Sequence, residues 1–259
     1  MQYSKISFIG GGRITKILLL GWKRAGKLPP QIFVTDTNPD ILENLKRDVP
    51  EIETGVNNPA MAAGYDIIII SLHPPIVGKV LLEIKSVVKP KAIVISLAPK
   101  ISIAKISEAL GGFRDIVRIN PNAPSIVNSG YNPIAFSSSI SEAGRESVLT
   151  LFRALGDCPE VPEELLEAYA IVTAMGPTYF WFQLYELQEL ARTFGLSAET
   201  LKDAIPKMIN GAVKTMYESG LNPEEVMDLI PVKPFVEDES AIKGSYRNRL
   251  TALYKKLKT

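Results

Sequence analysis

The sequence predicts an α/β domain with a parallel sheet, followed by an all-helical domain. In the first half, short runs of β-branched residues alternate with amphipathic stretches, as strands joined by crossover helices do. After Pro162 the strand-like runs stop and only helical patterns follow. A glycine-rich turn comes directly after the first run, and in doubly wound sheets ligands bind at such strand ends. We therefore predict two domains, residues 1–161 and 162–259.

The first strands and helices follow from the spacing of apolar residues. Lys5–Ile9 is a predicted strand, and Arg13–Ala25 is a predicted helix because its apolar residues recur at helical spacing. Gly26 suits the end of that helix. Gln31–Thr35 is the second predicted strand. Asn38, which a proline follows, is a suitable cap for the next helix.

The remaining strands of the first domain are mostly continuous apolar runs, as expected where helices cover both faces of a sheet. The runs in chain order are Asp66–Ser71, Ala92–Ser96 and Asp115–Ile119. Two shorter strands are predicted near Pro133–Phe136 and Asp157–Val161, on either side of a helix at Ser141–Leu155. The helices predicted in the second domain are Glu163–Phe194, Ser197–Glu218, Pro223–Ile230 and Glu239–Leu257.

The composition excludes several classes of function. The net charge is +1 and no basic stripe stands out, so we expect no nucleic-acid partner. The longest apolar runs are too short for a bilayer and no signal peptide is recognisable, so we expect a cytoplasmic protein without a membrane partner. With one cysteine (Cys158) and one histidine (His73), an intrachain disulfide and a Cys/His zinc site are excluded. An enzyme of this composition takes its chemistry from an organic cofactor.

The turn after the first strand reads Gly10-Gly-Gly12-Arg13 and leads directly into a helix. Glycines at this spacing let the chain turn sharply and let its backbone approach a pyrophosphate. The N-terminus of the helix adds N–H groups and the positive end of a dipole. Thr15 stands where glycine or alanine is usual, which loosens the contact between helix and strand. The pattern predicts a Rossmann-type domain that binds NAD or NADP.

The choice between NAD and NADP depends on the end of the second strand. Asp36 follows Gly10 by 26 residues, and a carboxylate there would accept hydrogen bonds from the adenosine ribose of NAD and repel the 2′-phosphate of NADP. Arg13 could instead reach a 2′-phosphate, and Asp36 could simply cap a turn. His73 follows the strand at Asp66–Ser71 and is predicted to line the same crevice, unless it is a surface residue of a proline turn. The predicted cofactor-binding set is Gly10, Gly12, Arg13, Ile14, Asp36, Asn58, Leu72, His73, Pro74 and Ala98.

Several blocks along nearly the whole chain follow one family's motifs in order. They are Phe8–Thr15, Ser71–Pro74, Ile95–Ala98, Val117–Pro124, Gly176–Tyr179 and Phe194–Leu196. With these blocks the chain resembles pyrroline-5-carboxylate reductase, which makes proline by reducing a cyclic imine. The resemblance implies a Rossmann domain and a helical domain that dimerises by interleaving helices.

The chain departs from that family where the substrate binds. The family holds the substrate's carboxylate and imine with a loop reading Thr-Ser-Pro-Gly-Gly-Thr-Thr, whereas Pro231–Glu237 here reads Pro-Val-Lys-Pro-Phe-Val-Glu. Because a backbone nest needs N–H donors and prolines remove them, this stretch is unsuited to hold a carboxylate in that way. The family's Ser-Gly-Ser-Gly has also become Thr173–Gly176. We therefore predict a small imine or carbonyl substrate other than pyrroline-5-carboxylate.

Few residues are available for chemistry on the substrate side. Asn122, after a strand end, and Thr173, in the helical motif, are the predicted catalytic residues. Thr173 could equally bond to its own helix backbone. Tyr179 is a further candidate, but its aromatic stretch is also typical of a helix core or a dimer interface. Lys233 could bind an anion or simply be exposed.

Besides proline synthesis by an altered site, two other functions remain open from the sequence: hydride exchange between NADP and a deazaflavin cofactor, and nucleotide sensing without catalysis. The altered loop motivates the second. The region Ala170–Leu184 is apolar almost all round, which marks a helix buried on several sides. We therefore expect a homodimer or a higher even-numbered homo-oligomer.

Overall fold

The structure, a computed structural model, describes residues 5–258. These residues form two compact units, one of residues 5–175 and 253–258 and one of residues 176–252. The last strand ends at Asp157 and helices follow from Glu163, close to the predicted domain boundary after residue 161, whereas the compact units divide at Gly176. The domain boundary after residue 161 therefore stays a prediction.

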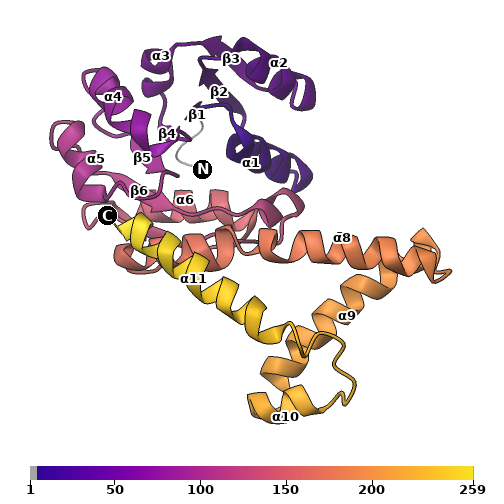
Figure 1. Ribbon diagram of the computed structural model, residues 1–259. Helices are drawn as coiled ribbons and strands as arrows, with labels where there is room; N and C mark the ends of the chain where they lie inside the picture. Colours follow the sequence, from indigo (N-terminus) through magenta and orange to yellow (C-terminus); the bar gives the residue numbers. More distant parts are fainter. Residues whose placement is uncertain (1–4, 259) are drawn as a thin grey trace. The chain divides into compact units, whose positions relative to one another are not determined.

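The first unit is built on a seven-stranded sheet in the order β3-β2-β1-β4-β5-β6-β8 (Figure 1). Neighbouring strands run parallel except β8, which is antiparallel to β6. Apart from this edge strand, the order is that of doubly wound dinucleotide-binding sheets, which confirms the predicted fold class. The strands are β1 (Lys5–Ile9), β2 (Gln31–Asp36), β3 (Glu53–Val56), β4 (Ile67–Ile70), β5 (Ile93–Ser96), β6 (Ile116–Ile119) and β8 (Ile134–Phe136).

Helices cover both faces of this sheet, which explains the continuous apolar strands. In β4, Ile67 and Ile69 pack in one core and Ile68 and Ile70 in the other, because alternate side chains point to opposite faces. Trp22 fills the first core and its Nε1 donates to the carbonyl of Leu151 at 2.9 Å. The first face carries α1 (Arg13–Arg24), α2 (Pro39–Asp48) and α6 (Glu142–Arg153). The second carries α3 (Pro59–Ala63), α4 (Pro74–Ile84) and α5 (Ile103–Ala109).

The predicted strand at Asp157–Val161 was wrong in extent. The structure has only a two-residue strand β9 (Gly156–Asp157), which pairs with β7 (Gly130–Tyr131) in a separate small sheet. Beyond it, Glu160 makes an isolated bridge to Ile134. Pro159 lies between them and has no N–H to continue a ladder.

The predicted continuous helix Glu163–Phe194 was also wrong. The amide of Met175 donates to the carbonyl of Ala170 at 2.9 Å, which is a π-helical bond, and α8 then restarts with Pro177 at its first position. The segments are η2 (Glu163–Leu165), α7 (Leu166–Tyr169), the π-helical turn η3 (Ala170–Ala174) and α8 (Pro177–Thr193).

The later helices agree with the prediction. They are α9 (Ala198–Glu218), α10 (Pro223–Asp228) and α11 (Glu239–Lys258). Ser197 caps α9 through its side chain, and Asn222 forms a capping box with Glu225 at the start of α10. Across the described part of the chain, no helix is both long and apolar enough to cross a membrane.

Candidate functional site

The carboxyl ends of four parallel strands meet at one edge of the sheet. The backbone ladder continues just beyond them: the amide of Gly10 donates to Thr35 O at 2.8 Å, and that of Ser71 to Ile9 O at 2.8 Å. The amide of Leu97 donates in the same way to Ile70 O at 3.0 Å. The turns after β1, β4 and β5 therefore lie side by side, at the edge where such sheets bind ligands.

Gly10 can only be glycine. Its φ is +107°, and a Cβ there would lie 2.4 Å from the carbonyl oxygen of Ser71. Thr15, the departure from the usual pattern, is fully buried, and its hydroxyl donates to Gly10 O at 2.7 Å. This bond ties the helix to the turn and explains how a threonine is tolerated there.

Gly12 is different, because the protein leaves the space beside it open. It is the N-cap of α1, with φ −68°, and a Cβ built on it meets no atom within 4 Å. No acidic residue stands in the first turn of α1, and Arg13 is exposed beside it. The amides of a first helical turn have no intrahelical acceptor, and the helix dipole favours negative charge there. This cradle fits a pyrophosphate.

Asp36 braces the same turn. Its Oδ2 accepts the amide of Gly11 at 2.7 Å and its Oδ1 accepts the amide of Asn38 at 2.9 Å. These two bonds agree with the alternative interpretation, in which Asp36 stabilises a turn. A carboxylate has about four acceptor positions, so two hydrogen bonds leave capacity for a ribose hydroxyl.

The other predicted cofactor residues lie around this edge. Asn58 donates its amide to Thr35 Oγ1 at 2.8 Å and caps α3 by accepting the amide of Met61 at 3.2 Å. His73 is the exposed N-cap residue of α4, and its ring makes no capping bond. Ala98 is buried and follows β5. The remaining members are partly buried: Ile14, Leu72 and Pro74.

The two predicted catalytic residues lie together, but their polar groups bond to the protein. Asn122 is 6% exposed; its Oδ1 accepts the amide of Tyr131 at 3.1 Å, and its Nδ2 donates to Thr173 O at 3.2 Å. The hydroxyl of Thr173 donates to Tyr169 O at 2.9 Å, the local bond that the sequence allowed. In this arrangement the pair fixes the π-helical turn η3 against the loop after β6.

A buried ion-pair cluster was missed by the sequence analysis. The side chain of Arg118, on β6, is 4% exposed; its Nη1 donates to Glu163 Oε1 at 3.0 Å and its Nη2 to Glu167 Oε1 at 2.7 Å. Burial raises the pKa of the Glu167 carboxyl, but the hydrogen bond and charge of Arg118 outweigh it, and the pKa lies below its usual range. One signal was available: an arginine inside the apolar strand Ile-Val-Arg-Ile needs a buried partner.

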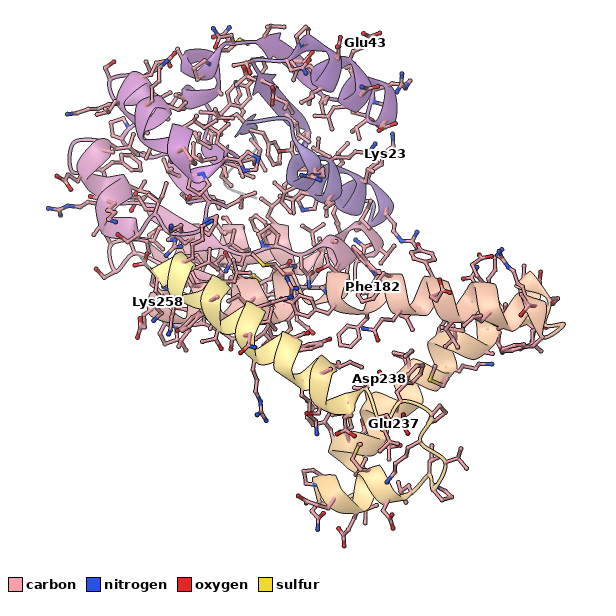
Figure 2. All side chains as sticks on the ribbon, viewed as in Figure 1. Lys23, Glu43, Phe182, Glu237, Asp238 and Lys258 are labelled. Atoms are coloured by element: carbon pink, nitrogen blue, oxygen red, sulfur yellow. The ribbon has the colours of Figure 1, made fainter. Side chains whose placement is uncertain are left out.

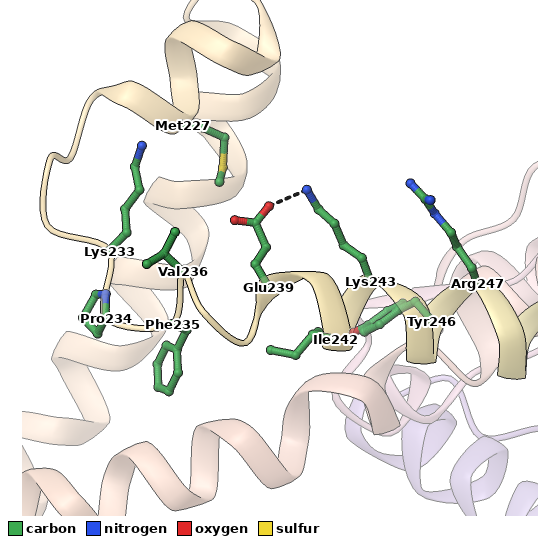
Figure 3. A pocket seen from close by; sticks show the side chains of 10 residues that line it. All are labelled: Met227, Lys233, Pro234, Phe235, Val236, Glu239, Ile242, Lys243, Tyr246 and Arg247. Atoms are coloured by element: carbon green, nitrogen blue, oxygen red, sulfur yellow. Dashed lines mark ion pairs between the residues drawn. The ribbon is translucent and has the colours of Figure 1, made fainter.

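The segment predicted to replace the family's substrate loop, residues 231–237, lies in the second unit. Residues 234–238 form successive turns, in which the amide of Val236 donates to Lys233 O at 3.2 Å and that of Asp238 to Phe235 O at 3.1 Å. Phe235 is 72% exposed. The segment borders a pocket of about 660 Å³, in which Glu239 pairs with Lys243 (Figure 3). Apolar side chains line most of this pocket, together with the charged side chains of Lys233, Glu239, Lys243 and Arg247.

The surroundings of Cys158 are unsuited to nucleophilic chemistry. Burial raises the pKa of the Cys158 thiol to about 12, with Arg153 opposing the shift, so the thiolate needed for nucleophilic attack is not formed near neutral pH. Among residues 5–258 no group of three or more histidine, cysteine or carboxylate side chains is placed to hold a metal ion.

One family model and a set of known proteins are similar to this chain. Residues 5–100 match the family described as NADP oxidoreductase coenzyme F420-dependent. The pyrroline-5-carboxylate reductase of Escherichia coli is 28% identical over 227 residues, which are 87% of this chain and 84% of that protein.

Solved structures agree over the whole chain. A pyrroline-5-carboxylate reductase from Coxiella burnetii superposes with a TM-score of 0.69 at 27% identity and covers 98% of this chain and 94% of its own. The Plasmodium falciparum pyrroline carboxylate reductase, solved with NADP bound, has a TM-score of 0.83 at 22% identity and covers 100% and 98%. At that identity the second likeness concerns the fold alone.

Proposed function

We propose that this chain, which is similar to pyrroline-5-carboxylate reductases over most of its length, is an NAD(P)H-dependent reductase of a small imine or carbonyl compound other than pyrroline-5-carboxylate. The cofactor part of the proposal is supported by the open space at Gly12, where the protein leaves room beside the N-terminus of α1. The substrate part of the proposal is supported by the segment at 231–237, which lacks the two glycines of the family's loop and has two prolines in place of one.

The residues of the first unit have separate parts in this proposal. Gly10 and Gly12 let the backbone meet the pyrophosphate, and the first turn of α1 donates to it. Asp36 accepts from the adenosine ribose, which favours NADH over NADPH. His73 and Ala98, after β4 and β5, line the other half of the dinucleotide. Bound there, the reduced nicotinamide supplies the hydride.

On the substrate side, the protein has to orient the acceptor and exclude water. An iminium substrate brings its own proton, whereas a ketone needs a donor at the developing alkoxide. The hydroxyl of Thr173 and the amide of Asn122 are both bonded within the protein. Both remain the proposed substrate-side residues, and there Asn122 positions the π-helical turn and does not donate a proton. Since both groups already donate within the protein, the arrangement favours an imine substrate, which needs no proton donor from the protein.

The second unit is proposed to form a homodimer. In the single chain, large apolar side chains stand exposed along α8, among them Phe182 at 67% (Figure 2). Exposed apolar surface of this extent is typical of an interface. The particle in solution is therefore expected at twice the chain mass of 28.4 kDa, or an even multiple of it.

The test is the oxidation of NADH by a set of cyclic imines and small ketones that includes pyrroline-5-carboxylate. We expect turnover with a member of the set and none above background with pyrroline-5-carboxylate. A matched variant replaces residues 231–237 with Thr-Ser-Pro-Gly-Gly-Thr-Thr and should gain pyrroline-5-carboxylate turnover. If the unchanged chain reduces pyrroline-5-carboxylate efficiently, the proposed change of substrate is wrong.

A second candidate is hydride exchange between NADPH and a deazaflavin. The match of residues 5–100 to an F420-dependent family favours it, but that match ends within the nucleotide half. The same assay with a deazaflavin as acceptor separates the two. Nucleotide binding with no acceptor turned over would instead favour a sensing protein.

A further inference from the structure

The loop after β5 contains a residue in a conformation that side chains avoid. Lys100 has φ +72°, in the left-handed region that favours glycine. A non-glycine residue stays there only where its surroundings fix it, and such residues gather at functional sites. Here the amide of Lys100 donates to Glu167 Oε1 at 3.2 Å.

A second carboxylate holds the far end of the same loop. Glu163 Oε1 accepts the amide of Ile103 at 2.7 Å. Arg118 binds both carboxylates, so Lys100 and Ile103 are joined to one guanidinium on the neighbouring strand β6. The loop is therefore fastened at two points by a cluster whose central cation is almost wholly buried.

The position of this loop, directly after β5, indicates which part of a bound dinucleotide it would contact. In the order β3-β2-β1-β4-β5, the glycine turn follows β1 and Asp36 ends β2. A dinucleotide whose pyrophosphate lies at the turn and whose adenosine lies over β2 must extend its other half over β4 and β5. Ala98, two residues before Lys100, follows β5 on that side.

We propose that Glu167 and Arg118 are positioning residues that hold the 97–103 loop in the conformation that seats the nicotinamide half of the cofactor. The inference rests on the proposed function, because it requires a bound dinucleotide. Neither residue touches the cofactor; both act through the loop backbone. Glu163 holds the far end of the loop in the same way.

The experiment compares NADH with ADP-ribose, which has the adenosine and pyrophosphate parts but no nicotinamide. In Glu167→Met the acceptor for the Lys100 amide is removed at similar side-chain volume. We expect NADH affinity to fall about tenfold, the emission of bound NADH to move toward that of free NADH, and ADP-ribose affinity to stay within about twofold.

Two further variants separate positioning from general damage. Glu167→Gln keeps an oxygen that can accept the Lys100 amide, so it should retain most of the NADH affinity. Glu164→Met changes an exposed glutamate of the same segment and should alter neither affinity. If Glu167→Met no longer binds ADP-ribose, Glu163→Met, at the more exposed carboxylate, gives the same comparison.

The outcomes distinguish this inference from the proposed function. An equal loss of both ligands in Glu167→Met and Glu163→Met, or no loss of either, would overturn the positioning role and leave the function standing. If the unchanged chain binds neither NADH nor ADP-ribose, the proposed function fails and the inference fails with it.

Discussion

Replacement of Gly12 by alanine is expected to lower NADH affinity by about 100-fold or more, equivalent to ~2.7 kcal/mol, while the fold stays intact. The reason is that the new methyl group meets no protein atom within 4 Å, so it enters the space where the pyrophosphate would lie. The φ of −68° is ordinary for alanine. Losing glycine as an N-cap costs about 1 kcal/mol at most. Calorimetric titration and a thermal melt measure the two effects separately.

Two other glycines provide the comparison. Gly78→Ala, on the exposed side of α4, also meets no atom within 4 Å and should leave NADH affinity unchanged. Gly10→Ala forces a methyl group to 2.4 Å from Ser71 O at a φ of +107°, so it should lose stability by a few kcal/mol as well as binding. Normal NADH affinity in Gly12→Ala would place the cofactor elsewhere.

Asp36→Asn is expected to change the coenzyme preference. At about 5 Å and an effective dielectric constant of ~20, one unit charge costs a 2′-phosphate about 3 kcal/mol, or a factor of about 100 in affinity. Removing that charge should raise NADPH affinity by this order. NADH affinity should fall, because asparagine has one acceptor oxygen and can keep only one of the bonds to the Gly11 and Asn38 amides. Titration of the variant with both nucleotides measures the ratio.

The control for this change is Asp40→Asn, which removes a nearby exposed charge at the start of α2. It should leave the ratio of affinities almost unchanged. If the unchanged chain prefers NADPH and Arg13→Ala removes that preference, then Arg13 reads the 2′-phosphate and the assignment of Asp36 is wrong.

The sheet could be predicted because its strands are unambiguous. A run such as Ile67–Ile70 between short turns indicates a strand covered on both faces. The edge strand β3 escaped prediction because Glu53–Val56 is mostly exposed and has no apolar run. The break at Gly176 was missed because apolar residues continue on both sides of it, so the periodicity alone favoured one long helix.

Site residues could be predicted only where a single physical requirement dictates which residue type is present. Gly10 and Gly12 were found because the turn needs them, and the structure gives each a separate reason. The bonds of Asn122 and Thr173 to distant backbone atoms depend on tertiary packing, and no spacing in the sequence shows them. In the sequence, nothing distinguishes Lys100 from an ordinary surface lysine. Only its positive φ in the structure shows that its backbone is held in an unusual conformation.

The most direct test of the central claim is a fluorescence titration of the unchanged chain with NADH. We predict saturable binding of one NADH per chain, with a shift in nicotinamide emission and with displacement by ADP-ribose. If emission stays that of free NADH at millimolar protein, and NADPH behaves alike, the turn at Gly10–Gly12 does not bind a dinucleotide and the account is contradicted.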